Sequence, residues 1–124
     1  MKTIEVIDFL VVLEGMSAVV RGRFLVFDFA GEKSLFAALP VGQYGMEKVP
    51  AESITKSHVH DFVSAYKSSG LDVLDHGTRH ELPSEALVIV LPGVSHSWIP
   101  KSEVGGEVGS CDERHERQQL EAAA

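Results

Sequence analysis

Short runs of alternating hydrophobic and polar side chains fill the chain from about residue 19 to residue 99. The segment VVRGRFLVFDFAG, residues 19–31, is typical, because it is rich in the β-branched and aromatic residues that favour strands. Glycine and proline recur between such runs, from Gly31 to Pro100, at the spacing expected for short strands joined by turns. The pattern predicts an all-β fold, either a sandwich or a barrel.

The clearest local element is a hairpin in the segment LDVLDHGTRHEL, residues 71–82. Two strand-like runs, Leu71–Leu74 and Arg79–Leu82, flank a turn that contains His76 and Gly77. Glycine readily takes the positive φ that such turns require, so this spacing predicts a tight β-hairpin.

The two ends of the chain differ from this middle part. The first 18 residues fit an entry helix or two strands, and their many Val and Ile residues favour strands. Their apolar run VIDFLVVL, residues 6–13, exceeds what the core needs and predicts a homodimer built on it. Beyond Pro100 the chain is rich in charge and glycine, so we expect one domain over residues 1–100 and a flexible polar tail over residues 101–124. The closing LEAAA is typical of a cloning remnant, and removal of residues from 104 onward is expected to leave the domain folded.

Composition narrows the functional classes. With 124 residues, 44% of them apolar and 23% charged, the chain is typical of one soluble globular domain. Its apolar runs are too short to cross a bilayer, and no basic region followed by an apolar block marks a signal peptide. A single cysteine, Cys111, favours a reducing, cytoplasmic setting. The net charge of −7 and the lack of basic clusters argue against nucleic acid as a partner, and we expect no membrane partner.

Histidine carries the strongest chemical signal in the sequence. His58 and His60, in KSHVHDF, stand two positions apart, and on a strand their side chains leave the same face roughly 6–7 Å apart. That separation lets two imidazoles share a metal ion, although a solvated strand end is the ordinary explanation for such a pair. His96 follows the apolar run Leu87–Leu91 and a Pro-Gly turn, where a hydrogen-bonded surface histidine is the ordinary alternative.

Taken in order, these features resemble the core of the cupins. An HxH motif, a glycine-bounded hairpin, an apolar strand and a Pro-Gly turn followed by histidine occur in the family's order within residues 58–98. The resemblance covers residues 45–99, fades over the first 40 residues and is absent after Pro100. It implies a jelly-roll β-barrel in which His58, His60 and His96 bind one divalent metal ion, with iron, nickel, manganese and zinc as candidates.

The chain departs from the cupin pattern at several positions. The family's metal-binding carboxylate would fall near Val63 or Ser64, and neither side chain carries one. Asp61 is close, but strict alternation puts it on the opposite face from the HxH pair unless a bulge redirects it. Residues that replace expected glycines or a proline are Glu52, Glu85 and Leu91. Three of the family's four metal-binding positions are therefore retained.

The resemblance also implies which side chains surround the histidines. The segment 86–91 would be an inner strand buried on both faces, and the turn after it would direct His96 into the barrel. Tyr66 shares the alternation of the HxH pair, so we expect it to point inward, either to donate its hydroxyl to a ligand or to pack in the core. The remaining pocket candidates are a hydroxyl in place of the carboxylate and two apolar lining groups: Ser64, Phe62 and Trp98.

Two classes of function fit these features. The first is a small metal-dependent enzyme, for which the resemblance implies a dioxygenase or isomerase acting on a small anionic metabolite, since three neutral imidazoles leave the metal's positive charge unreduced. The second is a non-catalytic barrel that binds a small molecule, with the imidazoles bonded to one another and to water. The missing carboxylate favours the second class. A purely structural or assembly role rests only on the apolar N-terminal run.

Overall fold

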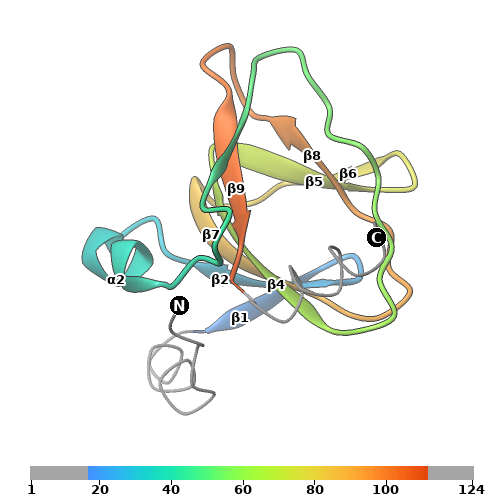
Figure 1. Cartoon of the computed structure of the whole chain (residues 1–124), viewed down its shortest axis with the longest axis horizontal. Coiled ribbons are helices and arrows are strands. Elements are labelled where there is room, and N and C mark those ends of the chain that lie inside the picture. Colours follow the sequence, from blue (N-terminus) through green and yellow to red (C-terminus); the bar gives the residue numbers. More distant parts are fainter. Residues whose placement is uncertain (1–16, 112–124) are drawn as a thin grey trace.

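The computed structural model describes residues 17–111, which form two antiparallel β-sheets and one short helix (Figure 1). The larger sheet has six strands in the order β1 (Ala18–Arg21), β2 (Phe24–Asp28), β7 (Glu85–Val90), β4 (Ser64–Ser69), β9 (Gly106–Ser110) and β3 (Glu47–Val49). The smaller sheet has three strands in the order β6 (Thr78–His80), β5 (Leu71–Asp75) and β8 (Ser97–Pro100). Helix α2 (Lys33–Ala38) follows β2 in the chain.

The prediction of an all-β fold is confirmed by this arrangement. The larger sheet ends at β1 and β3 and the smaller sheet at β6 and β8, so neither closes into a barrel within residues 17–111. The two sheets are held together by one shared cluster of buried side chains. The structure therefore shows a β-protein of two antiparallel sheets around a common core.

The main core lies between the two sheets. Side chains alternate between the faces of a strand, so every second residue of the larger sheet points into this core. The smaller sheet contributes Leu71 and Val73 from β5 and Trp98 from β8. The larger sheet contributes Phe24, Val26, Val49, Tyr66, Ala86, Val88, Val90 and Val108.

Strand β7 is buried on both faces, as its uninterrupted apolar run predicts. Val88 and Val90 face the main core, whereas Leu87 belongs to a second cluster on the outer face of the larger sheet. Phe36 of α2 packs against that second cluster, and this contact holds the helix beside the larger sheet (Figure 1). The strand ends at Val90, and Leu91 beyond it is 54% exposed.

The predicted hairpin forms between β5 and β6. Asp75 pairs with Thr78, so the turn consists of His76 and Gly77, whose φ angles are 49° and 83°. Two positive φ angles in a two-residue turn match the right-handed twist of the strands on either side. Histidine tolerates this region better than most residues other than glycine.

The prediction that a flexible tail begins after Pro100 is wrong for residues up to 111. Strand β9 lies inside the larger sheet, paired with β4 on one side and β3 on the other, and Cys111 beyond it is buried. Its glycines reflect close packing, because a Cβ at Gly106 would lie 2.5 Å from the Ser69 carbonyl oxygen and one at Gly109 2.6 Å from the Gly45 carbonyl oxygen. Residues 112–124 lie outside the described part of the chain.

The predictions made for residues 1–16, including the homodimer built on residues 6–13, also lie outside the described part of the chain. Where the description begins, β1 is an edge strand whose four residues are all exposed. Within residues 17–111, α2 is far too short to cross a membrane, and no other helix is long and apolar enough to do so.

Candidate metal and ligand site

Backbone pairing gathers the three predicted histidines on one face. The His58 N–H donates to the His96 carbonyl and the His96 N–H donates to the His58 carbonyl, both at 2.9 Å, which makes the two residues a directly opposed antiparallel pair. The Gly93 N–H donates to the His60 carbonyl at 2.8 Å and extends this pairing. Opposed residues project their side chains to the same face, and so does the residue two positions along the strand. The side chains of His58, His60 and His96 therefore converge.

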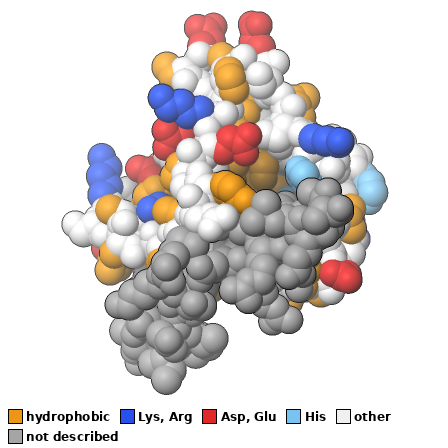
Figure 2. Space-filling view, viewed as in Figure 1, with side chains coloured by type: hydrophobic (Ala, Val, Ile, Leu, Met, Phe, Trp, Pro, Cys, Tyr) orange, Lys and Arg blue, Asp and Glu red, His pale blue; other side chains and the backbone are white. Residues whose placement is uncertain are grey.

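We call these three residues the imidazole cluster. The ring centroids of His60 and His96 are 5.2 Å apart, and the His58 ring lies 6.0 Å from His60 and 6.2 Å from His96. Exposure increases along the cluster: His96 is 1% exposed, His60 is half-buried and His58 is exposed. The cluster thus runs from the core to the surface. Figure 2 shows histidine side chains on one face of the molecule, one of them next to hydrophobic side chains.

A directed chain of hydrogen bonds fixes the chemistry of the buried end. His96 Nδ1 lies 3.1 Å from the Val94 carbonyl oxygen, which can only accept, so Nδ1 carries the proton and Nε2 keeps its lone pair. The Tyr66 hydroxyl lies 3.1 Å from that Nε2 and donates to it. Because the hydroxyl has one proton, His60 Nε2, 3.2 Å away, is the donor to the same oxygen. Both imidazoles are oriented by Tyr66.

The buried imidazoles are neutral near pH 7. The pKa of His96 is lowered from 6.5 to about 4, mainly by burial, to which the neighbouring His60 and His58 add and which the Val94 carbonyl and Asp75 oppose. Burial also lowers the pKa of His60, again assisted by His58 and opposed by Asp61. A neutral imidazole with a lone pair is the form that binds a metal ion or accepts a hydrogen bond.

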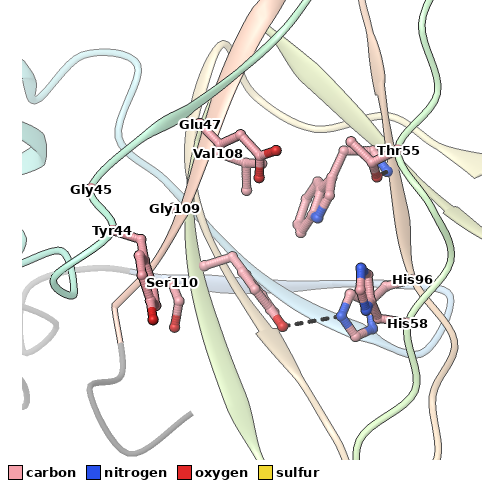
Figure 3. A pocket seen from close by; sticks show the side chains of 11 residues that line it. Tyr44, Gly45, Glu47, Thr55, His58, His96, Val108, Gly109 and Ser110 are labelled. Atoms are coloured by element: carbon pink, nitrogen blue, oxygen red, sulfur yellow. Dashed lines mark hydrogen bonds between the residues drawn. The ribbon is translucent and has the colours of Figure 1, made fainter. Parts of the chain in front are cut away.

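A cavity of about 230 Å³ adjoins the cluster between the larger sheet and the chain segment that carries His58. In Figure 3, Tyr44 and Ser110 lie on one side of the cavity, and His58, His96 and Thr55 lie on the other. The full lining is Tyr44, Gly45, Glu47, Thr55, His58, Tyr66, His96, Trp98, Val108, Gly109 and Ser110. This volume accommodates only a small ligand, which would meet imidazole, phenol, hydroxyl and carboxylate groups.

Of the other predicted site residues, some line the cavity and others do not. Tyr66 and Trp98 line the cavity, and their rings pack edge to face with centroids 5.4 Å apart. Phe62 instead stacks on the His60 ring at 5.0 Å. Ser64 is buried on the same face of β4 as Tyr66, but it does not line the cavity, and its hydroxyl has no hydrogen-bond partner within residues 17–111. Asp61 is exposed and acts on His60 through its charge.

Sequence reasoning missed much of the cavity wall. Ser110 lies directly across from Tyr66 in the pairing of β9 with β4, but it belongs to the stretch expected to be a tail. Thr55 is held near the cluster because its hydroxyl accepts from the Trp98 N–H at 2.8 Å. Tyr44 and Glu47 come from the loop before β3 and from β3 itself. The one sequence signal for this wall was the strand-like pattern of residues 106–110, and the glycines in it hid that pattern.

The fit of the cluster to a metal ion is partial. In the part of the chain that the structure describes, no three histidine, cysteine, aspartate or glutamate side chains are positioned to hold a metal ion as they stand. The reason is that the Nε2 atoms of His60 and His96 converge on the Tyr66 oxygen, while the His58 ring stands farther off. In favour of a metal, His96 Nδ1 donates to a backbone carbonyl, which is how metal-binding histidines are usually oriented. The exposed His58 side chain is free of core packing and is the one that must turn toward the other two.

Two buried carboxylates next to the main core are already paired. Asp75 accepts two hydrogen bonds from Arg23 at 2.8 Å and one from the Ser95 hydroxyl at 3.0 Å, and the Arg23 bond holds its pKa below the usual range against the effect of burial. Burial raises the pKa of Asp72, but hydrogen bonds from Lys101, the Leu82 N–H and Arg79 outweigh it and lower the pKa. These carboxylates serve the fold.

No protein-family model and no curated protein sequence matches the chain. The resemblance to the cupins therefore rests on the order of the motifs, and the function must be argued from the side chains.

Proposed function

We propose that this protein binds a divalent metal ion at His58, His60 and His96 and holds a small anionic ligand in the adjoining cavity. The observation that carries the proposal is the β-bridge between His58 and His96, which gathers three imidazoles on one face with the buried ones neutral. Iron, nickel, manganese and zinc all accept imidazole nitrogen, and this donor set does not choose among them.

The ligand class follows from charge. Three neutral imidazoles donate lone pairs without cancelling any of the metal's charge, so the site favours anions that bind through oxygen or nitrogen. A bound metal would supply Lewis acidity to such a ligand. The chain's own groups would orient it: Tyr66 and Ser110 offer hydroxyls in the cavity, and Trp98 excludes water on the core side. A dioxygenase or isomerase acting on a small anionic metabolite is the enzyme class that fits.

A second candidate is metal-free binding of a small ligand by the same cavity. The Tyr66 hydroxyl bonds to the Nε2 atoms of both His60 and His96, so the buried end of the cluster is satisfied by the protein itself. In this case His58, the exposed member, would be the group that meets the ligand.

Two wider expectations belong to the same proposal. We propose that the sheets represent a divergent cupin jelly roll, supported by the motif order along the segment before β4, the β5–β6 hairpin and the turn after β7. We also propose a homodimer, supported by the apolar run at residues 6–13 and by the exposed edge strand β1, which can pair with another strand.

Titration of iron, nickel, manganese and zinc into chelator-stripped protein tests the metal. The wild type should bind one equivalent, and His58→Ala and His96→Gln should each lower the affinity by at least about tenfold, because each removes one of three protein ligands. His76→Asn is the matched control, since His76 is exposed in the hairpin turn and asparagine accepts its positive φ. If the wild type binds no metal better than His96→Gln does, metal-free binding takes its place. A thermal shift of the stripped protein with small carboxylic acids would then support the second candidate.

A further inference from the structure

Tyr66 occupies the centre of the imidazole cluster. Its ring comes from β4, which pairs with β7 along its length and with β9 from Tyr66 onward, so the position of the phenol is set by an inner strand of the sheet. The side chain is 7% exposed, and Trp98 packs edge to face against its ring. The hydroxyl therefore has little freedom to move away from the two imidazoles that it contacts.

The Tyr66 oxygen lies at the distance from two imidazole nitrogens that separates neighbouring ligands of one ion. The Tyr66 oxygen is 3.1 Å from His96 Nε2 and 3.2 Å from His60 Nε2. Neighbouring ligands bound at about 2.0–2.1 Å lie about 2.9 Å apart in an octahedral arrangement and about 3.4 Å apart in a tetrahedral one. The observed separations fall between these two values. The Tyr66 oxygen is therefore at ligand-to-ligand distance from each of the two imidazole nitrogens.

We propose that Tyr66 is itself a metal ligand, acting as a phenolate beside His60 and His96, with His58 completing the set. This inference rests on the proposed metal-binding function and adds a residue to it. When the ion binds, the metal–oxygen bond replaces the O–H bond, and the hydroxyl proton leaves to the solvent buffer. At His60 the Nε2 proton, which the Tyr66 oxygen accepts in the metal-free protein, is exchanged through solvent for one on Nδ1, so that the Nε2 lone pair binds the ion and the ring stays neutral. One proton is released in all, and no oxidant is required.

The phenolate also accounts for the missing carboxylate. Neither Val63 nor Ser64 can supply a negative charge, whereas ionised Tyr66 places one beside the imidazoles from the same strand as Ser64. A hard anionic oxygen favours Fe(III) and Cu(II) over softer ions. The site would thus keep one anionic ligand, contributed by a phenol two residues away, which cancels one of the metal's positive charges and leaves the remainder for an added anion.

Visible spectroscopy tests this assignment with a signal that activity does not affect. We would add Fe(III) or Cu(II) to chelator-stripped full-length protein and record the phenolate-to-metal charge-transfer band. The wild type should show the band, and Tyr66→Phe should lack it and bind the ion at least about tenfold more weakly. The chain has 2 tyrosines, and the other one, Tyr44, also lines the cavity, so Tyr44→Phe serves only to assign the band, which it should keep.

The outcomes separate the two proposals. A wild type that binds the ion at His58, His60 and His96 without a charge-transfer band overturns the role of Tyr66 and leaves the metal function standing. A wild type that binds neither Fe(III) nor Cu(II), nor any of the divalent ions of iron, nickel, manganese and zinc, overturns both. If Tyr66→Phe fails to fold, resonance Raman spectra of the metal-loaded wild type decide the question, because tyrosinate vibrations must then appear in resonance with the band.

Discussion

Two of the regions that bury polar side chains, the carboxylates of β5 and the imidazole cluster, treat charge in opposite ways. Asp72 and Asp75 of β5 are surrounded by Arg79, Lys101 and Arg23, and their lowered pKa values mean that the charged form is favoured. In the imidazole cluster the lowered pKa values of His60 and His96 mean that the charged form is disfavoured. The first region is saturated with ion pairs, whereas the second keeps neutral donors. Only the second has the chemistry to receive an added cation.

The largest effect on both regions is expected from the removal of β9. A stop after Glu103 deletes an inner strand that pairs with both β4 and β3 and that carries Ser110 and Val108 of the cavity wall. We expect loss of the cooperative thermal transition, measured by circular dichroism. A stop after Cys111 keeps β9 and should retain the transition. Cooperative melting of the shorter chain would show that the larger sheet folds without β9.

Acid should act on the imidazole region first. The folded-state pKa of His96, about 4, lies below its unfolded value of 6.5, so the unfolded chain binds more protons between these values. Stability is therefore complete above pH 6.5 and is lost as the pH falls toward 4, by about 3 kcal/mol for the metal-free protein. Urea unfolding at several pH values measures this. His96→Gln should make the unfolding free energy nearly constant between pH 4 and pH 6.5. Asp75→Asn should change its value but leave this pH dependence in place.

Removing a buried carboxylate should lower the free energy of unfolding by a smaller amount, and this loss should not vary between pH 4 and pH 6.5. Asp72→Ala leaves Arg79, Lys101 and the Leu82 N–H without their shared acceptor. We expect a loss of about 2 kcal/mol in the free energy of unfolding, reduced by the 44% and 30% exposure of the two cationic side chains. Glu103→Ala, at an exposed carboxylate, is the control and should change stability by less than about 0.5 kcal/mol. Equal effects of the two substitutions would mean that Asp72 is not a structural anchor.

The smallest expected effect on stability belongs to His58→Ala. His58 is exposed, and its contribution to the backbone pairing with His96 uses main-chain atoms that alanine also has. Unfolding free energy should change by less than about 0.5 kcal/mol, although metal affinity falls. A large loss of stability in the metal-free protein would place His58 among the structural residues.

Parts of this picture were predictable from local patterns. The unbroken apolar run of β7 predicted burial on both faces, and His76-Gly77 predicted the hairpin, because both depend only on neighbouring residues. Alternation also placed Tyr66 on the inner face. These features follow from the two-residue period of a strand and from the φ preference of glycine.

The rest depends on contacts between distant segments. The bridge between His58 and His96 is a non-local pairing, and no period in the sequence sets its register. The double hydrogen bond of Tyr66 depends on that register. Strand β9 was missed because glycine was taken as a sign of flexibility, whereas Gly106 and Gly109 allow close backbone packing. The opposite roles of buried aspartate and buried histidine likewise appear only once their partners are in place.

X-ray absorption at the metal edge tests the central claim most directly. Protein loaded with one equivalent of zinc or iron should show light-atom ligands at about 2.0–2.1 Å and outer-shell scattering from three imidazoles, reduced to two in His58→Ala. Those three imidazoles would be His58, His60 and His96, gathered by the bridge between the residue before β8 and the segment before β4. A spectrum without imidazole scattering, or one that is unchanged in His58→Ala, would contradict the account.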